Sequence, residues 1–129
     1  MKYPIAIEPG NEKHAFSVVV PDLPGCFSAG DTLDQALDNA REAIDLWLET
    51  RIDDGGTIPE PRPIGEHYNA PEYAGWIWAV LEIDLAQLSD KTERVNITLP
   101  SRILRRIDRA AQAAGESRSG FIARRMLAM

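Results

Sequence analysis

The chain has 129 residues, 44% of them apolar and 26% charged, which suits one domain, or one small domain plus a mini-domain, and excludes a largely disordered protein. The net charge of −6 is divided unevenly, because residues 1–90 carry five Lys/Arg against seventeen Asp/Glu and residues 91–129 carry nine against three. A balance of −12 followed by one of +6 predicts a basic end that meets a polyanion, and an acidic part that avoids that polyanion or meets a basic protein.

Strand signals open the sequence. Lys2–Glu8 alternates apolar and polar side chains, and His14–Val20 is rich in β-branched and aromatic residues. These two runs predict a hairpin around the turn Pro9-Gly10-Asn11. Two prolines in Pro21-Asp22-Leu23-Pro24-Gly25 end the second strand, because proline has no N–H to give to a sheet, and a short third strand is expected around Cys26–Ala29.

A long helix is predicted next. Gly30 ends the third strand, and either Asp31 or Thr32 caps the helix, which runs to about Ile52. Its apolar residues recur at three- and four-residue spacing: Leu33, Ala36, Leu37, Ala40, Ile44, Trp47 and Leu48. The opposite face carries acids: Asp34, Asp38, Glu42, Asp45 and Glu49. Gly55-Gly56 stops the helix, and three prolines at alternate positions make residues 57–65 extended.

Residues Trp76–Leu85 read as another strand. One face carries Ile77, Ala79, Leu81 and Ile83, which can pack on the helix. The other face carries Trp76, Trp78 and Val80, and its two indole rings need cover. Exposed aromatic area of this kind marks an interface. Alternatively, residues 57–74 fold over the rings, and the sequence leaves both interpretations open.

The last part of the chain follows a short polar hinge at 86–91. Lys91–Leu99 alternates strictly and ends at Pro100, which predicts a strand. Ser101–Ala114 is predicted to be helical, with Gly115 at its C-terminal end. Ser117 caps a final helix that contains Phe121, Ile122, Met126 and Leu127.

This tail is expected to act only as a dimer. One strand and two short helices cannot bury a core, and a lone strand leaves its backbone groups unpaired, whereas two copies can pair their strands and share one apolar centre. The side chains facing the helices would be Val95, Ile97 and Leu99. A two-stranded ribbon fits the major groove of B-DNA, and the outer face would offer base-reading side chains: Arg94, Asn96 and Thr98.

The turn before the last helix adds a phosphate clamp. Free N–H groups at a helix start, together with Ser117, Arg118 and Ser119, suit a DNA phosphate. Alternating strand, terminal proline, two short helices and this turn together resemble the ribbon-helix-helix family over residues 92–129. The resemblance implies sequence-specific DNA binding by a homodimer.

No catalytic constellation is found, and we expect neither a metal nor a cofactor. His14 and His67 have no ligand-spaced partners, and Cys26 reads as a buried structural thiol. Glu82 and Asp84 share a strand face, which leaves a metal-dependent nuclease as a weak alternative. No apolar run approaches the roughly 18 residues of a membrane span, and the N-terminus lacks signal-peptide features. With a single cysteine, these features favour the cytoplasm.

Several segments resemble the HicB antitoxin family. They are Phe16 through Phe27, which holds Pro21-Asp22-Leu23-Pro24-Gly25-Cys26, then Gly30-Asp31-Thr32-Leu33, the small-residue helix positions Ala36, Ala40 and Ala43, and Ile58-Pro59-Glu60-Pro61. With the tail included, the likeness spans nearly the whole chain. It implies an α+β protein with a small, partial RNase H-like β-β-β-α-β domain at 1–85, a hinge at 86–91 and a ribbon-helix-helix (β-α-α) domain at 92–129.

The resemblance also implies two partners. The N-terminal domain would bind and inhibit a HicA-like toxin, a small basic protein that cleaves mRNA, and the C-terminal domain would bind operator DNA and repress its own operon. Trp76 and Trp78 are candidate anchors for the toxin or for a second antitoxin dimer, which would make a tetramer. The alternative is a free-standing ribbon-helix-helix regulator whose N-terminal domain senses a small molecule or only oligomerises.

Overall fold

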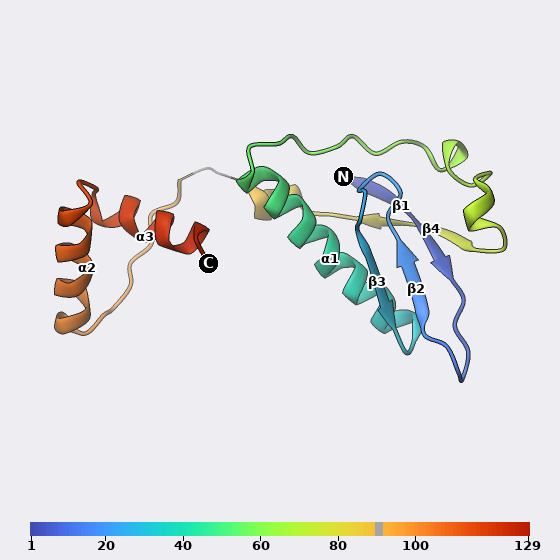
Figure 1. Cartoon of the computed structure of the whole chain (residues 1–129), viewed down its shortest axis with the longest axis horizontal. Helices are drawn as coiled ribbons and strands as arrows, with labels where there is room; N and C mark the ends of the chain where they lie inside the picture. The colour runs from blue at the N-terminus through green and yellow to red at the C-terminus, as the bar shows by residue number, and fades with distance from the viewer. Residues whose placement is uncertain (90–91) are drawn as a thin grey trace. The chain divides into compact units, whose positions relative to one another are not determined.

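The structure is a computed structural model that describes residues 1–89 and 92–129 (Figure 1). The chain divides into two compact units, residues 1–90 and 91–129, which are described separately. Within the described residues the fold is mixed α/β, with one four-stranded antiparallel sheet and three α-helices. The strands are β1 (Lys2–Glu8), β2 (Phe16–Val19), β3 (Phe27–Gly30) and β4 (Ile77–Glu82). The helices are α1 (Leu33–Asp53), α2 (Ser101–Ala113) and α3 (Arg118–Leu127), with short 3-10 helices η1 (Ile64–Glu66), η2 (Pro71–Tyr73) and η3 (Leu85–Leu88).

The sheet of the first unit has the strand order β3-β2-β1-β4. In the register, Ile7 lies opposite Val18 on β2 and opposite Ile77 on β4, and Tyr3 lies opposite Leu81. Because side chains alternate along a strand, these residues share one face of the sheet. Figure 1 shows α1 lying across the sheet and covering it on one side.

Helix α1 closes the core on that face. Thr32 is its N-cap and accepts a hydrogen bond from the Gln35 N–H at 3.1 Å, while the Gln35 side chain accepts one from the Asp31 N–H. Caps of this kind satisfy N–H groups that the first turn leaves free. The buried core consists of Tyr3, Ile5, Ile7, Val18, Val20, Leu23, Cys26, Ala36, Ala40, Ile44, Leu48, Leu81 and Ile83.

Gly30 explains part of the Gly-Asp-Thr-Leu motif. A Cβ atom at this position would lie 2.4 Å from the backbone nitrogen of Ala36. The first turn of α1 therefore passes too close to the end of β3 for any side chain, and only glycine lets the strand turn directly into the helix.

The predicted order of elements in the first unit is confirmed, with small shifts at the ends. The third strand starts one residue later than expected, and the last strand is shorter than Trp76–Leu85. Of the two candidate caps, Thr32 is the one used. Part of the expected hinge at 86–91 belongs to η3, and residues 90 and 91 lie outside the described residues.

The second unit has the two predicted helices but no strand among its described residues. Residues 92–99 are neither helix nor strand, and residue 91 of the expected strand lies outside the described residues. A strand needs a neighbour for its N–H and C=O groups, and a single chain does not supply one here. Gly115 adopts a positive φ of 68° after α2, which is the left-handed conformation that ends many helices. Among the helices that the structure describes, none has both the length and the apolar character for crossing a membrane.

Candidate functional site

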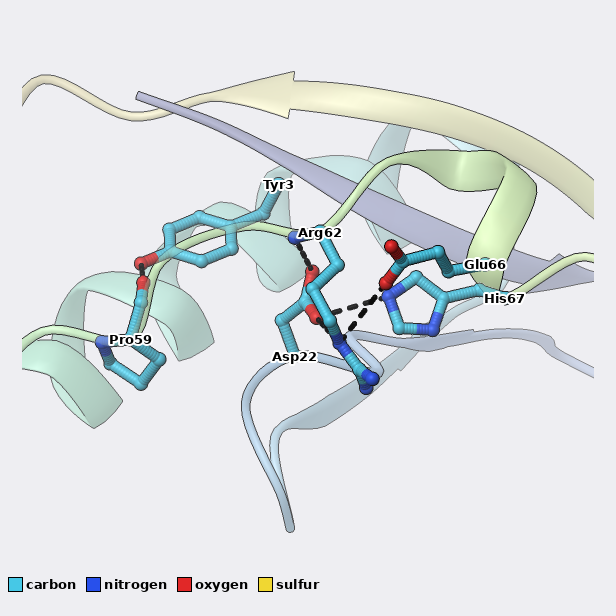
Figure 2. Close-up of polar contacts among 6 residues, drawn as sticks. All are labelled: Tyr3, Asp22, Pro59, Arg62, Glu66 and His67. Atoms are coloured by element: carbon cyan, nitrogen blue, oxygen red, sulfur yellow. Dashed lines mark hydrogen bonds and ion pairs between the residues drawn. The ribbon is translucent and has the colours of Figure 1, made fainter.

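A buried carboxylate joins the Pro-Asp-Leu-Pro-Gly-Cys turn to the segment that precedes β4 (Figure 2). Asp22 accepts hydrogen bonds from the backbone N–H of Arg62 at 3.0 Å and from the Arg62 Nε at 3.2 Å. The Nε2 atom of His67 lies 3.0 Å from the same carboxylate. The side chain of Asp22 is 2% exposed, so these three contacts replace its lost hydration. The motif aspartate thus fixes the position of η1 and the residues before it.

Tyr3 anchors the start of the same segment. Its hydroxyl donates to the carbonyl oxygen of Pro59 at 2.6 Å (Figure 2). Burial, with the nearby carboxylates of Asp22 and Glu60, raises the pKa of Tyr3 to about 12. The hydroxyl therefore stays protonated and remains a donor at every physiological pH.

The two tryptophans of the β4 region are partly covered by the segment that Asp22 holds. The ring of His67 stacks on Trp78 with 6.2 Å between centroids, and Tyr73 meets the edges of Trp76 and Trp78 at 5.3 and 5.4 Å. Both tryptophans are half-buried in the single chain. Residues 57–74 thus do fold over this face, as the second interpretation held, while part of each indole ring stays accessible.

A second apolar surface lies at the other edge of the sheet. Phe27 on β3 is 67% exposed and Leu46 on α1 is 66% exposed. With the half-buried Trp47 they border a hollow of about 460 Å³. We call Phe27, Leu46 and Trp47 the α1–β3 surface. The indole N–H of Trp47 donates to the Pro24 carbonyl at 2.9 Å, and the guanidinium of Arg51 lies over its ring, so the tryptophan is held in place.

The thiol of Cys26 lies under this surface. Burial raises its pKa to about 11, so it is a neutral thiol at physiological pH. A nucleophilic cysteine requires the thiolate. The side chain is therefore suited to packing, as the sequence indicated. Within residues 1–89 and 92–129, no group of His, Cys, Asp and Glu side chains is arranged to hold a metal ion.

The apolar side chains of the second unit are left open in the single chain. Val95 and Ile97 are 77% and 69% exposed, and Ala111 is the only buried residue among those described in the unit. Ile97 and Leu99 border a hollow of about 360 Å³ together with Leu104 and Ile122 of the helices. As a single chain, the described part of this unit therefore buries little apolar surface.

The predicted DNA-contacting residues lie in two places, on the segment before α2 and at the start of α3. Arg94, Asn96 and Thr98 are exposed on the segment before α2. The Ser117 hydroxyl caps α3 by accepting from the Gly120 N–H at 3.1 Å. Arg118 is engaged elsewhere, because its guanidinium forms a two-point ion pair with Asp108 on α2 at 2.7 and 2.9 Å. This pairing lowers the pKa of the Asp108 carboxyl and leaves Arg118 less free for a phosphate than the sequence suggested.

Sequence reasoning missed a row of arginines on α2. Spaced three or four residues apart on the face opposite the apolar one, they are exposed and border a hollow of about 420 Å³: Arg102, Arg105, Arg106 and Arg109. We call them the arginine quartet. The unit has three acids, and Asp108 and Glu116 pair with arginines of α3. Within the described residues, no carboxylate forms an ion pair with the quartet. The four guanidinium groups therefore repel one another, and a bound anion would relieve this repulsion.

Comparison with known proteins identifies the family of this chain. The family model described as "HicB_like antitoxin of bacterial toxin-antitoxin system" matches residues 3–126. The chain belongs to this HicB-like antitoxin family. A 14.9 kDa protein from the rep-hol intergenic region of Haemophilus phage HP1 is 44% identical, over 95% of this chain and 92% of the relative. The curated relatives also include Antitoxin HicB 1 of Photorhabdus laumondii, 38% identical over 53% of this chain and 43% of its own length.

Solved HicB structures share the fold. The Burkholderia pseudomallei antitoxin HicB is 41% identical, with a TM-score of 0.71 over 98% of this chain and 94% of that one. The antitoxin HicB3 is 32% identical, with a TM-score of 0.60 over 95% and 93% of the two chains. A chain from a HicA3–HicB3 toxin–antitoxin complex matches 65% of this chain and 99% of itself, at 33% identity and a TM-score of 0.56. The role of an antitoxin in a toxin–antitoxin system follows from this membership.

Proposed function

We propose that this chain binds and inhibits a HicA-like mRNA-cleaving toxin and represses its own operon by sequence-specific DNA binding. The observation that carries the proposal is the likeness to HicB over 98% of the chain, joined to the division into an acidic unit and a basic one. The HicB3 relative occurs in a complex with HicA3. An acidic unit attracts a basic RNA-cleaving protein, and a basic unit attracts DNA.

Co-expression with the neighbouring open reading frame tests this function. We expect the chain to rescue growth from the toxin and to purify with it. A neighbouring product that is neither toxic nor bound, together with retained DNA binding, would favour the free-standing regulator instead. The toxin anchors that the sequence suggested, Trp76 and Trp78, stay candidates through the accessible parts of their rings.

We further propose that the second unit is a ribbon-helix-helix dimer. Two copies of residues 92–99 would pair as antiparallel strands, which supplies the hydrogen-bond partners that each lacks alone. Val95 and Ile97, exposed in one chain, would then enter the shared core. Arg94, Asn96 and Thr98 would lie on the outer face of the ribbon, which fits the major groove.

Arg94→Ala and Asn96→Ala should each relax operator specificity. A bidentate arginine–guanine or asparagine–adenine contact contributes about 1–3 kcal/mol of discrimination, so each change should lower the operator-over-random affinity ratio by roughly 5- to 150-fold. Competition gel shifts with operator and scrambled duplexes measure this ratio. Arg125→Ala, an exposed arginine near the end of α3, is the matched control and should leave the ratio unchanged. Equal ratios for all variants would contradict the ribbon.

The arginine quartet should contact phosphates rather than bases. Replacing Arg105, Arg106 and Arg109 with Gln should weaken binding to operator and random DNA alike. The slope of log K against log salt is negative, and it should become shallower by about 0.9 for each phosphate that the variant no longer neutralises. Arg124→Gln is the control, because Arg124 is already paired with Glu116 at 2.6 Å. Fluorescence anisotropy across salt concentrations measures the slope, and a slope unchanged in the triple variant would assign the quartet to another partner.

A further inference from the structure

We propose that the α1–β3 surface is the docking site for a basic protein, with Phe27, Leu46 and Trp47 as its apolar anchors. This inference rests on the proposed antitoxin function and names the surface that would take the toxin. It differs from the expectation drawn from the sequence, which named Trp76 and Trp78 on the β4 side as candidate anchors for the toxin or for a second antitoxin dimer.

Two of the apolar side chains of this surface are largely exposed to solvent. Phe27 and Leu46 are each about two-thirds exposed, among the most exposed large apolar residues that the structure describes in the first unit. Leu46 lies off the buried stripe of α1 and is not part of the buried core. Exposed apolar area beside a hollow of about 460 Å³ is typical of an interface centre.

Side-chain contacts hold the surface in place. The bond from Trp47 to the Pro24 carbonyl fixes the indole, and Arg51, which stacks on that ring, also donates from its Nε to the Thr57 carbonyl at 3.2 Å. An anchor already in its bound geometry loses little conformational entropy when a partner arrives. The β4 edge of the sheet is less open, because His67 and Tyr73 already lie on its tryptophans.

Acidic side chains lie beside the Leu46 anchor on α1. Glu42, Glu49 and Asp53 lie four residues before, three after and seven after Leu46, so on a helix they border it. All three are exposed, and none has an ion-pair partner among the described residues. In a symmetric contact between two copies this acidic rim would face its counterpart, with Arg51 the only cation among the residues that line the hollow. A basic partner instead gains attraction at the rim and apolar burial at the centre.

Binding of the purified HicA-like toxin from the neighbouring open reading frame, measured by calorimetry and stopped-flow, tests the surface. Phe27→Ala/Leu46→Ala should weaken the Kd by at least about 30-fold, because apolar hot spots are worth 2 kcal/mol or more. Ile77→Ala/Val80→Ala is the matched control, since both residues are exposed apolar positions on β4. It should stay within about twofold of wild type.

A second pair of variants tests the acidic residues beside Leu46. Glu42→Gln/Glu49→Gln should slow association about tenfold at low salt, with the difference shrinking as salt rises. Glu8→Gln/Glu12→Gln removes the same charge at the β1–β2 end of the sheet and should change the rate much less. Thermal melts establish that each variant is folded, and Leu46→Gln alone repeats the test on an exposed helix position.

Four results would overturn the inference. Toxin affinity lost in Ile77→Ala/Val80→Ala but kept in Phe27→Ala/Leu46→Ala would move the site to the β4 side. Unchanged toxin affinity with altered self-association in sedimentation would assign the surface to a second copy of this chain. A wild-type chain that binds no toxin would remove the proposed function and the surface together, whereas a wild type that binds while the variants bind equally well would remove only the surface.

Discussion

Ile97→Asp is expected to abolish both dimerisation and operator binding. In the proposed dimer the Ile97 side chain faces the helices, and in the single chain it borders a hollow with Leu104 and Ile122. Burying an unpaired carboxylate there would cost several kcal/mol, comparable with the whole stability of a unit this small. Sedimentation equilibrium at micromolar concentration should show loss of the dimer through this unit, and a gel shift should show no operator complex.

Thr98→Asp is the matched control for this prediction. It places the same charge one residue further along, on the face that would meet DNA. We expect this variant to remain dimeric and to lose operator binding, because a carboxylate faces the phosphates and base acceptors. Toxin binding by the first unit should survive in both variants. A dimer that tolerates Ile97→Asp but not Thr98→Asp would reverse the two faces and contradict the proposed ribbon.

Most of the local structure could be predicted because it depends on neighbours in sequence. The cap at Thr32, the stripe of α1 and the Gly115 and Ser117 ends of the last two helices follow from spacing and side-chain chemistry alone. The alternation in β4 indicates which of its side chains share the core face, such as Leu81, but not that β4 pairs with β1. These signals act within about one helical turn or one strand pair, where propensity and pattern agree.

The strand expected before Pro100 shows the limit of local reasoning. Its alternation is plain in the sequence, yet residues 92–99 form no strand in one chain. The pattern specifies which face each side chain would take. It does not supply the hydrogen-bond partner, which the proposal assigns to another molecule.

The site features that the sequence did not indicate join distant residues. Asp22 meets Arg62 and His67, 40 and 45 positions away, through a proline-rich segment with no periodicity to follow. In the sequence His67 has no ligand-spaced partner that would mark it as a metal ligand, and its role as a buried partner of a carboxylate has no local signal. Leu46 does have a local sequence signal. On a helical projection it lies among acidic residues and away from the apolar stripe, where a leucine is not expected.

Asp22→Ala is expected to release the segment that covers the β4 tryptophans. The change leaves the Arg62 N–H and the His67 ring without their acceptor in a site where the carboxylate is 2% exposed. Such losses typically cost about 2–4 kcal/mol, and the exposed guanidinium of Arg62 keeps the value below that of a fully buried pair. Urea unfolding followed by tryptophan fluorescence measures this loss.

The matched control removes a carboxylate from the same cluster. Glu66 lies 3.9 Å from the Arg62 Nε with both side chains more than half exposed, so Glu66→Ala should cost less than about 0.5 kcal/mol.

Folded Asp22→Ala should also show red-shifted tryptophan emission and faster amide exchange over residues 58–73, because His67 no longer stays stacked on Trp78. Stability lost without that local exchange would mean that Asp22 supports the turn before β3 rather than the cover. Asp22→Ala is expected to uncover the β4 tryptophans and to leave the α1–β3 surface unchanged. Toxin affinity equal to that of wild type in this variant would therefore argue that the toxin does not bind on the β4 side.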